Sequence, residues 1–326
     1  MAEKPPNTRS GSNAAARDAS GSSVGIVGLG LVGAALARRL RAAGRAVVGF
    51  DIDPAKVSAL AQDGVAGADS LTALSARCSV FIIAVFDTDQ LEAVLLDADG
   101  LIATATPASR YINVATADPD RVAALGKFVH GRGLALIEAP FIGSSDAIRA
   151  GEATMIVGGD AAHIHALRDQ LDQLSPTWHH VGPCGMAARA KLAANLVLGL
   201  NRAALAEGLI FAELIGLDQR RFVELLRDSP AYSRVIDTKA DRMISGQFMP
   251  PQGRLGQHAK DARLITTQAM DRGQFLPLAM RHLALLDEAV SQGDGGMDNS
   301  AVIYAIRRLR KPATIGPAKP PPEAIP

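Results

Sequence analysis

The sequence predicts an α/β domain with a doubly wound, mostly parallel sheet, joined by a long helix to an all-helical C-terminal domain. Two observations support this prediction. Strand-like and helix-like runs alternate through the first half of the chain, which is the pattern of βαβ units. A proline-free run of good helix formers then fills residues 186–215, and the helical runs after it contain no convincing strand.

Each element has a local reason. Residues 23–27 are apolar and β-rich, residues 31–43 have helical spacing that ends at Gly44, and residues 54–62 form a helix that Pro54 opens at its first turn. Further buried strands are predicted at 46–50, 80–85, 111–114, 134–139, 154–157 and 177–181, with a single helix at 161–174 before the last of them. After the long helix, helical runs are predicted at 220–227, 259–272, 277–292 and 299–309.

Composition bounds the domains and the partners. We expect a disordered leader at 1–22, an α/β domain at 23–183, a helical domain at 184–310 and a disordered proline-rich tail at 311–326. Lys and Arg total 34 against 33 Asp and Glu, so a nucleic-acid partner is not expected. No apolar run reaches the length of a membrane span, about 18 residues.

The two cysteines, Cys78 and Cys184, make neither a disulfide framework nor a metal cluster, so we expect no metal and a cytoplasmic location.

A glycine-rich loop lies between the first strand and the first helix, with the sequence Gly28-Leu29-Gly30-Leu31-Val32-Gly33. In this position Gly28 permits a tight turn, Gly30 lets the backbone approach a pyrophosphate, and Gly33 lets the helix pack closely on the strand. The phosphates then lie at a helix N-terminus, where free N–H groups favour anions. The loop predicts a Rossmann-type dinucleotide-binding domain.

Asp51 ends the second strand, and a carboxylate there accepts hydrogen bonds from ribose hydroxyls and repels a 2′-phosphate. No arginine follows it, and Asp53 adds negative charge. We therefore predict NAD as the cofactor in preference to NADP. The alternative is that Asp51 is an ordinary turn residue before Pro54.

Four separated stretches of the chain then point to a family. They are GIVGLGLVG at 25–33, EAPFIGSSDAIRAGEATMIVGG at 138–159, GPCGMAARAKLAAN at 182–195, and Lys260-Asp261 followed by GDGGMDNSAV at 293–302. In this order they resemble the β-hydroxyacid dehydrogenase family, which includes 3-hydroxyisobutyrate dehydrogenase and tartronate semialdehyde reductase and belongs to the 6-phosphogluconate dehydrogenase superfamily. The resemblance implies an NAD-binding Rossmann domain, a long connecting helix and a helical domain, and hydride transfer between a small β-hydroxy acid and a nicotinamide.

Lys191 and Asn195 are four residues apart, so they lie on one face of the long helix. The resemblance implies that Lys191 is the acid/base lysine and that Asn195 orients the substrate. Desolvation and a neighbouring cation can bring a lysine amine into the working pH range. By the same resemblance Thr116 lies near the nicotinamide ribose, and Lys260 reaches toward the nicotinamide. The alternative is that both lysines are solvated surface residues.

The resemblance also implies that residues 142–145 hold the substrate's acid group, because Gly143, Ser144 and Ser145 can present N–H groups and hydroxyls. Ile142 stands where the family has a serine. Ser144 or Ser145 therefore replaces the missing hydroxyl, or Ile142 faces an apolar substituent of the substrate.

Two other functions share these features. An imine reductase has the same architecture, but such enzymes usually lack this lysine and prefer NADPH. A non-catalytic NAD-binding redox sensor needs no Lys191–Asn195 pair. The candidate substrates by resemblance are 3-hydroxyisobutyrate, tartronate semialdehyde or glycerate, threonate and 3-hydroxypropionate, and we expect a homodimer or homotetramer.

Overall fold

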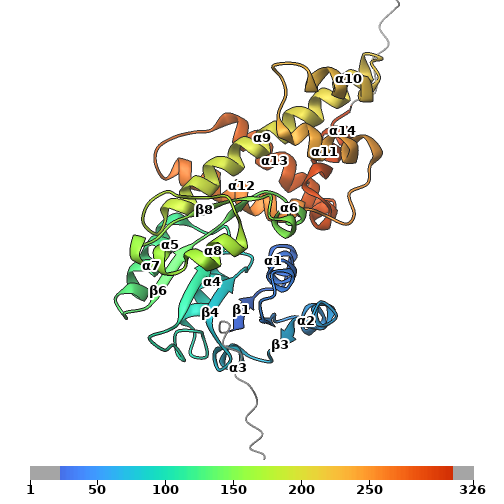
Figure 1. The fold of residues 1–326 in the computed structure, drawn as a ribbon. Helices are drawn as coiled ribbons and strands as arrows, with labels where there is room; N and C mark the ends of the chain where they lie inside the picture. Colours follow the sequence, from blue (N-terminus) through green and yellow to red (C-terminus); the bar gives the residue numbers. More distant parts are fainter. Residues whose placement is uncertain (1–22, 311–326) are drawn as a thin grey trace, which may run out of the picture.

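The computed structural model of the chain describes residues 23–310, and the leader and tail expected at 1–22 and 311–326 lie outside the described residues. It has a doubly wound α/β domain and a helical domain, as expected (Figure 1). The first domain is built on a six-stranded parallel sheet with the order β3-β2-β1-β4-β5-β6. Its strands are β1 (Ser23–Val27), β2 (Val47–Phe50), β3 (Ala66–Gly67), β4 (Cys78–Ile83), β5 (Arg110–Asn113) and β6 (Ala135–Glu138).

Both faces of the sheet are covered, which explains its long apolar runs. In β4, Val80 and Ile82 belong to a core cluster that α1 and α8 complete, whereas Phe81 and Ile83 belong to a cluster with α4 and α5. This alternation follows from the two-residue period of a strand. The helices of this domain are α1 (Leu31–Ala42), α2 (Pro54–Ala61), α3 (Leu71–Ser75), α4 (Thr88–Leu96), α5 (Pro119–His130), α6 (Ser145–Ala150), α7 (Ala161–Ala166) and α8 (Arg168–Leu174).

A second, three-stranded sheet was not expected. It has the order β7-β8-β9, formed by β7 (Phe141–Ile142), β8 (Thr154–Val157) and β9 (Trp178–His180). The β7–β8 pair is antiparallel and the β8–β9 pair is parallel. The single helix expected at 161–174 is also wrong, because the backbone of Leu167 leaves the helical region and divides it into α7 and α8. Leu167, Leu171 and Leu174, which share one face by helical spacing, are all buried in the core.

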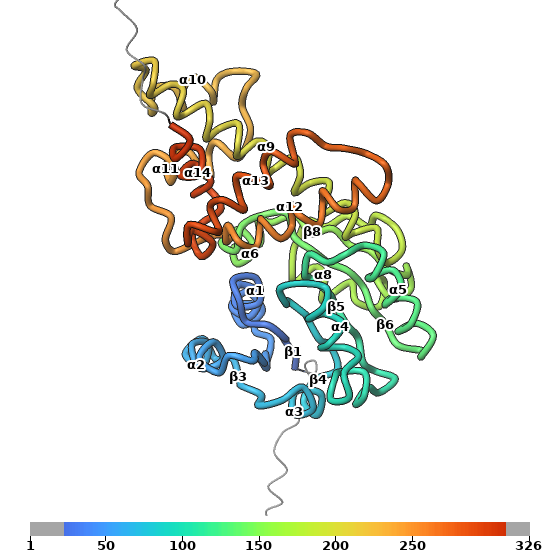
Figure 2. The backbone as a smooth tube through the Cα atoms, turned by 180° about the vertical axis from the view of Figure 1, so that it is seen from behind, coloured from blue at the N-terminus to red at the C-terminus, as the bar shows by residue number. Residues whose placement is uncertain are grey.

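Helix α9 (Met186–Leu214) connects the domains, and at 29 residues it spans about 44 Å at the helical rise per residue. Figures 1 and 2 show it running from the edge of the first domain through the helical domain. The other helices of that domain are α10 (Gln219–Arg227), α11 (Arg234–Ser245), α12 (Leu255–Met270), α13 (Pro277–Ser291) and α14 (Val302–Arg308). Within residues 23–310 no strand follows β9, and only an isolated bridge joins Arg254 to Asp298.

By length and composition α9 is apolar enough to cross a membrane, which corrects the expectation that no segment would meet this test. The helix packs against α11, α12, α13 and α14 and buries Leu205, Leu209 and Ala212 among them. Its apolar composition therefore serves the core of the helical domain in this structure.

Candidate active site

The β1–α1 loop lies at the point where the strand order of the large sheet reverses, between β1 and β4. Ligands of open α/β sheets bind at this edge. Gly28 has a φ of +86°, and a Cβ on Gly33 would lie 1.9 Å from the Gly28 carbonyl oxygen, so both positions require glycine. A Cβ on Gly30 would meet no heavy atom within 4 Å. The space above Gly30 is therefore open on the side where a pyrophosphate approaches.

The N-terminus of α1 is left free for an anion. The neighbouring helices α2, α4 and α5 each begin at an aspartate whose carboxylate accepts a hydrogen bond from the first turn: Asp53, Asp87 and Asp118. Helix α1 begins at Gly30 with no side-chain cap and no acidic residue in its first turn. Leu31 and Val32 supply the first N–H groups of the helix and are half-buried. A dinucleotide phosphate fits these unpaired donors.

Asp51 lies beside this loop at the end of β2. Its Oδ2 accepts a hydrogen bond from the Leu29 N–H at 2.7 Å, and its Oδ1 accepts one from the Asp53 N–H at 2.9 Å. Lys56 Nζ lies 3.2 Å from Oδ1. Burial alone would raise the pKa of the Asp51 carboxyl, but the two N–H groups and the ammonium hold that pKa below its usual range. Sequence reasoning missed Lys56.

Lys191 projects from the second turn of α9 toward the substrate segment, where its Nζ donates a hydrogen bond to the Phe141 carbonyl oxygen at 2.5 Å. Burial is the largest cause that lowers the pKa of Lys191. Asp261 opposes it, Lys260 and Arg202 add to it, and the resulting pKa is about 8. The amine is therefore not the freely solvated lysine of the alternative interpretation. An amine that ionises near 8 can both accept and donate a proton near neutral pH.

Asn195 and Lys260 meet at one carboxylate, that of Asp261. Asn195 Nδ2 donates to Asp261 Oδ2 at 3.0 Å, and Lys260 Nζ lies 2.9 Å from Asp261 Oδ1. Lys260 also donates to the carbonyl oxygens of Thr116 at 2.7 Å and Phe86 at 3.0 Å. Although Lys260 and Asp261 are neighbours in a helix and were expected to face apart, their side chains converge. This network joins the helical domain to the ends of β4 and β5.

Glu138 fixes the start of α9. Its Oε2 accepts a hydrogen bond from the Gly185 N–H at 2.5 Å, and its Oε1 accepts one from the Ala188 N–H at 3.0 Å. Burial raises the pKa of Glu138 to about 7, and the backbone N–H groups oppose this shift. Gly158 leaves the room that the carboxylate needs, because a Cβ there would lie 2.8 Å from Oε2. The helix that carries Lys191 is therefore seated on a buried carboxyl group.

The substrate segment lies beside Lys191, because Phe141 and Ile142 are adjacent in β7. Ile142 is half-buried, and Gly143 is exposed with a φ of +152°. Ser144 Oγ accepts a hydrogen bond from the Ala147 N–H and so caps α6. Ser145 donates its N–H at 3.1 Å and its hydroxyl at 3.2 Å to the Gln252 carbonyl oxygen. The structure thus brings residues 142–145 close to Lys191. The Ser144 hydroxyl oxygen acts as an acceptor, whereas Ser145 donates both its N–H and its hydroxyl.

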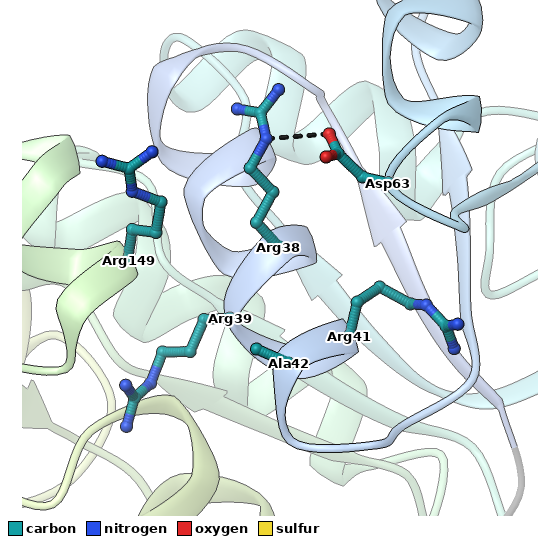
Figure 3. Close-up of a pocket in the computed structure, with 6 residues that line it drawn as sticks. All are labelled: Arg38, Arg39, Arg41, Ala42, Asp63 and Arg149. Carbon is teal, nitrogen blue, oxygen red and sulfur yellow. Dashed lines mark hydrogen bonds and ion pairs between the residues drawn. The ribbon is translucent and has the colours of Figure 1, made fainter.

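A separate hollow lies beside α1 and α6, lined by Arg38, Arg39, Arg41, Ala42, Asp63 and Arg149. Figure 3 shows that its guanidinium groups fan apart and do not converge on one point. Arg38 pairs with Asp63 at 2.8 Å, and Arg39 donates to the Gln173 carbonyl oxygen. The three α1 arginines lie in the second half of that helix, away from the glycine loop, so this hollow is not part of the candidate active site.

Comparison with known proteins gives two family matches that follow the two domains. Residues 23–182 match the NAD binding domain of 6-phosphogluconate dehydrogenase, and residues 185–306 match the NAD-binding domain of NADP-dependent 3-hydroxyisobutyrate dehydrogenase. L-threonate dehydrogenase of Cupriavidus necator is 28% identical over 89% of this chain and 97% of its own.

Two solved structures are similar to this chain to different degrees. The structure of 3-hydroxyisobutyrate dehydrogenase from Salmonella typhimurium is 25% identical, covers 87% of this chain and 99% of its own, and has a TM-score of 0.79. An imine reductase from Pseudomonas sp. is 21% identical with a TM-score of 0.55, over 87% of this chain and 99% of its own. The imine reductase is similar in fold alone.

Proposed function

The chain belongs to the β-hydroxyacid dehydrogenase family, and from that premise we propose that it is an NAD-dependent dehydrogenase of a small β-hydroxy acid. The observation that carries the proposal is the position of Lys191 Nζ, which is held against the Phe141 carbonyl oxygen beside the substrate segment, with a pKa lowered by burial to about 8. A nucleotide-binding protein without chemistry has no need of a desolvated amine at this place.

Bound NAD would supply the acceptor for the hydride that leaves the hydroxyl-bearing carbon of the substrate. Gly30, the free N–H groups of α1 and the Asp51 carboxylate would hold it. The neutral amine of Lys191 takes the hydroxyl proton as the carbonyl forms, and its ammonium returns the proton in the reverse direction. Asn195 orients the substrate oxygen through its amide, and Asp261 holds that amide in place.

We propose that the acid group of the substrate binds at Gly143 and Ser144. Ser145 already spends its N–H and its hydroxyl on the Gln252 carbonyl oxygen. The Ser144 oxygen only accepts, from Ala147, so its proton remains available to a carboxylate. Ser144 is thus the better replacement for the hydroxyl that Ile142 lacks. Ile142 then faces the substituent that distinguishes 3-hydroxyisobutyrate, threonate and glycerate.

The preference for NAD over NADP is a further part of the proposal, and it gives a prediction. Replacing Asp51 with serine removes a carboxylate that repels a 2′-phosphate and releases Lys56 to bind one. We expect the NAD/NADP ratio of kcat/KM to fall by at least about tenfold, the effect of one hydrogen bond to a charged group. Steady-state kinetics with both cofactors measure the ratio, and Asp69→Ser on the nearby surface is the control. An unchanged ratio would remove Asp51 from cofactor selection.

The proposed function is tested by offering purified protein L-threonate, 3-hydroxyisobutyrate, glycerate and 3-hydroxypropionate with NAD and following NADH absorbance. We expect turnover of at least one acid. If the protein instead reduces cyclic imines, it is an imine reductase. If it binds NAD tightly but turns over neither class, it is a non-catalytic sensor. The presence of Lys191 favours the dehydrogenase over both.

We also propose a cytoplasmic homodimer or homotetramer. Large apolar side chains stand exposed at the outer end of α9 and on α10: Phe211, Leu214, Ile215 and Leu225. This exposed apolar patch supports self-association of the chain through its helical domain.

A further inference from the structure

We propose that Gln252 of the helical domain is a positioning residue, which fixes the substrate segment from across the domain boundary. The inference rests on the proposed function, since it concerns the same segment, residues 142–145. Gln252 lies in the connection between α11 and α12, 107 residues from Ser145 in sequence. Figures 1 and 2 both show α6 lying against the helical domain.

Gln252 contacts the first turn of α6 with both its backbone and its side chain. Its carbonyl oxygen accepts the N–H and the hydroxyl of Ser145, and its Nε2 donates to Asp146 Oδ2 at 3.1 Å. Three hydrogen bonds therefore run from one residue to two consecutive residues. These residues, Ser145 and Asp146, directly follow Ser144, which is proposed to hold the acid group of the substrate.

Gln252 is itself held on a buried ion pair. Lys239 Nζ and Asp298 Oδ1 lie 2.9 Å apart, and their side chains are 8% and 0% exposed. The Gln252 N–H donates to Asp298 Oδ2 at 2.9 Å, and its Oε1 accepts from Lys239 at 3.2 Å. Every polar group of Gln252 thus has a partner. Two hydrogen bonds thus anchor Gln252 to a buried pair of charges, neither of which can be removed without leaving the other uncompensated.

The substrate segment is consequently held at both ends. At its start, Lys191 on α9 binds the Phe141 carbonyl oxygen. At its end, Gln252 binds Ser145 and Asp146. Only three residues, 142–144, lie between these attachments, so a displacement at Ser145 moves the groups proposed to bind substrate. A displacement of 1 Å is enough to weaken a positioned site.

The experiment exchanges donor and acceptor in the hydrogen bond between the Gln252 and Asp146 side chains. Gln252→Glu keeps the acceptor for Lys239 but places a second carboxylate against Asp146. We expect KM for the hydroxy acid to rise about tenfold, the loss of roughly one charge-assisted contact. We expect kcat and KM for NAD to stay within about twofold, because Lys191 and the glycine loop lie in other elements and keep their own contacts. The double variant Gln252→Glu/Asp146→Asn restores a donor opposite the carboxylate, so KM should return toward the wild-type value.

The control is Gln247→Ala, an exposed glutamine in the same connection, which should leave all kinetic constants unchanged. A second readout is hydrogen exchange at the Ser145 amide, which Gln252→Glu should accelerate and the double variant should slow again. If KM and exchange stay at wild-type values in Gln252→Glu, or if Asp146→Asn restores neither, the proposal is overturned. A wild-type protein that turns over no hydroxy acid would refute the proposed function, while the exchange data would still decide whether Gln252 fixes this segment.

Discussion

Replacing Lys191 with methionine is expected to lower kcat for the hydroxy acid by about 10²- to 10⁴-fold, the usual contribution of a positioned acid or base. Methionine approximates the length and apolar stem of lysine without its amine, so α9 should keep its packing. NAD affinity should stay near the wild-type value, because the glycine loop and Asp51 lie in other elements. Steady-state assays measure kcat, and titration with NAD measures the affinity. Lys127→Met on the exposed face of α5 is the control.

Lys191→Arg separates charge from proton transfer. A guanidinium stays protonated throughout the working range, so it cannot accept the hydroxyl proton. We expect this variant to be about as inactive as Lys191→Met although it keeps the positive charge. Substantial activity in either variant would show that another group carries the proton.

The pH profile of the wild-type protein gives an independent check. Burial lowers the pKa of Lys191 to about 8, and alcohol oxidation needs the neutral amine. The rate of oxidation should therefore rise with pH through about 8 and level off above it, while carbonyl reduction should fall over the same range. A profile that is flat between pH 7 and pH 9 would argue against Lys191 as the base.

Local patterns in the sequence were sufficient to predict the fold and part of the candidate site. The glycine loop, Asp51 and the Lys191–Asn195 spacing depend on residues that are close along the chain, and a helix or a βα unit fixes their relation. The two-domain fold follows from periodicity in the same way. Several elements were not predicted: the helices α3, α4, α5, α6 and α11 and the two-residue strands β3 and β7. The start of α5 had a usable signal, because Asp118 and Pro119 form an N-cap followed by proline.

Contacts between distant residues could not be predicted from these patterns. Glu138 caps α9 from 47 positions away, and Asn195 finds Asp261 at a separation of 66. The apolar pattern that predicts a strand at 134–139 does not show which helix begins beside Glu138. Lys260 and Asp261 show the same limit, since helical spacing predicts that they diverge, and Asn195 together with the strand ends draws them to one place.

Replacing Gly33 with alanine is expected to destabilise the protein by about 3 kcal/mol or more, the upper range for forced overpacking. The new Cβ would lie 1.9 Å from the Gly28 carbonyl oxygen and 3.4 Å from the Ala84 Cβ. Backbone cannot yield as a flexible side chain does, so α1 must move away from β1. Thermal unfolding measures the loss, and NAD binding should fall with it because the loop is displaced.

Gly30→Ala should weaken NAD binding without destabilising the fold. Gly30 has a φ of −69° and a ψ of −162°, which an L-residue adopts without strain, and no heavy atom lies within 4 Å of the added Cβ. Thermal stability should therefore match the wild type or slightly exceed it. NAD affinity should drop by at least about tenfold, since the methyl group occupies the space through which the pyrophosphate reaches the N–H groups of α1.

The two glycines thus separate the folding requirement of the loop from its binding requirement. Gly296→Ala is the matched control, because that glycine also has open space around it and an ordinary φ but lies in the helical domain, between α13 and α14. Calorimetric titration with NAD, run beside thermal unfolding, reports both properties for all three variants. If Gly30→Ala binds NAD as tightly as the wild type, the dinucleotide does not cross the start of α1. If Gly33→Ala melts like the wild type, the contact with Gly28 does not limit how closely α1 packs on the sheet.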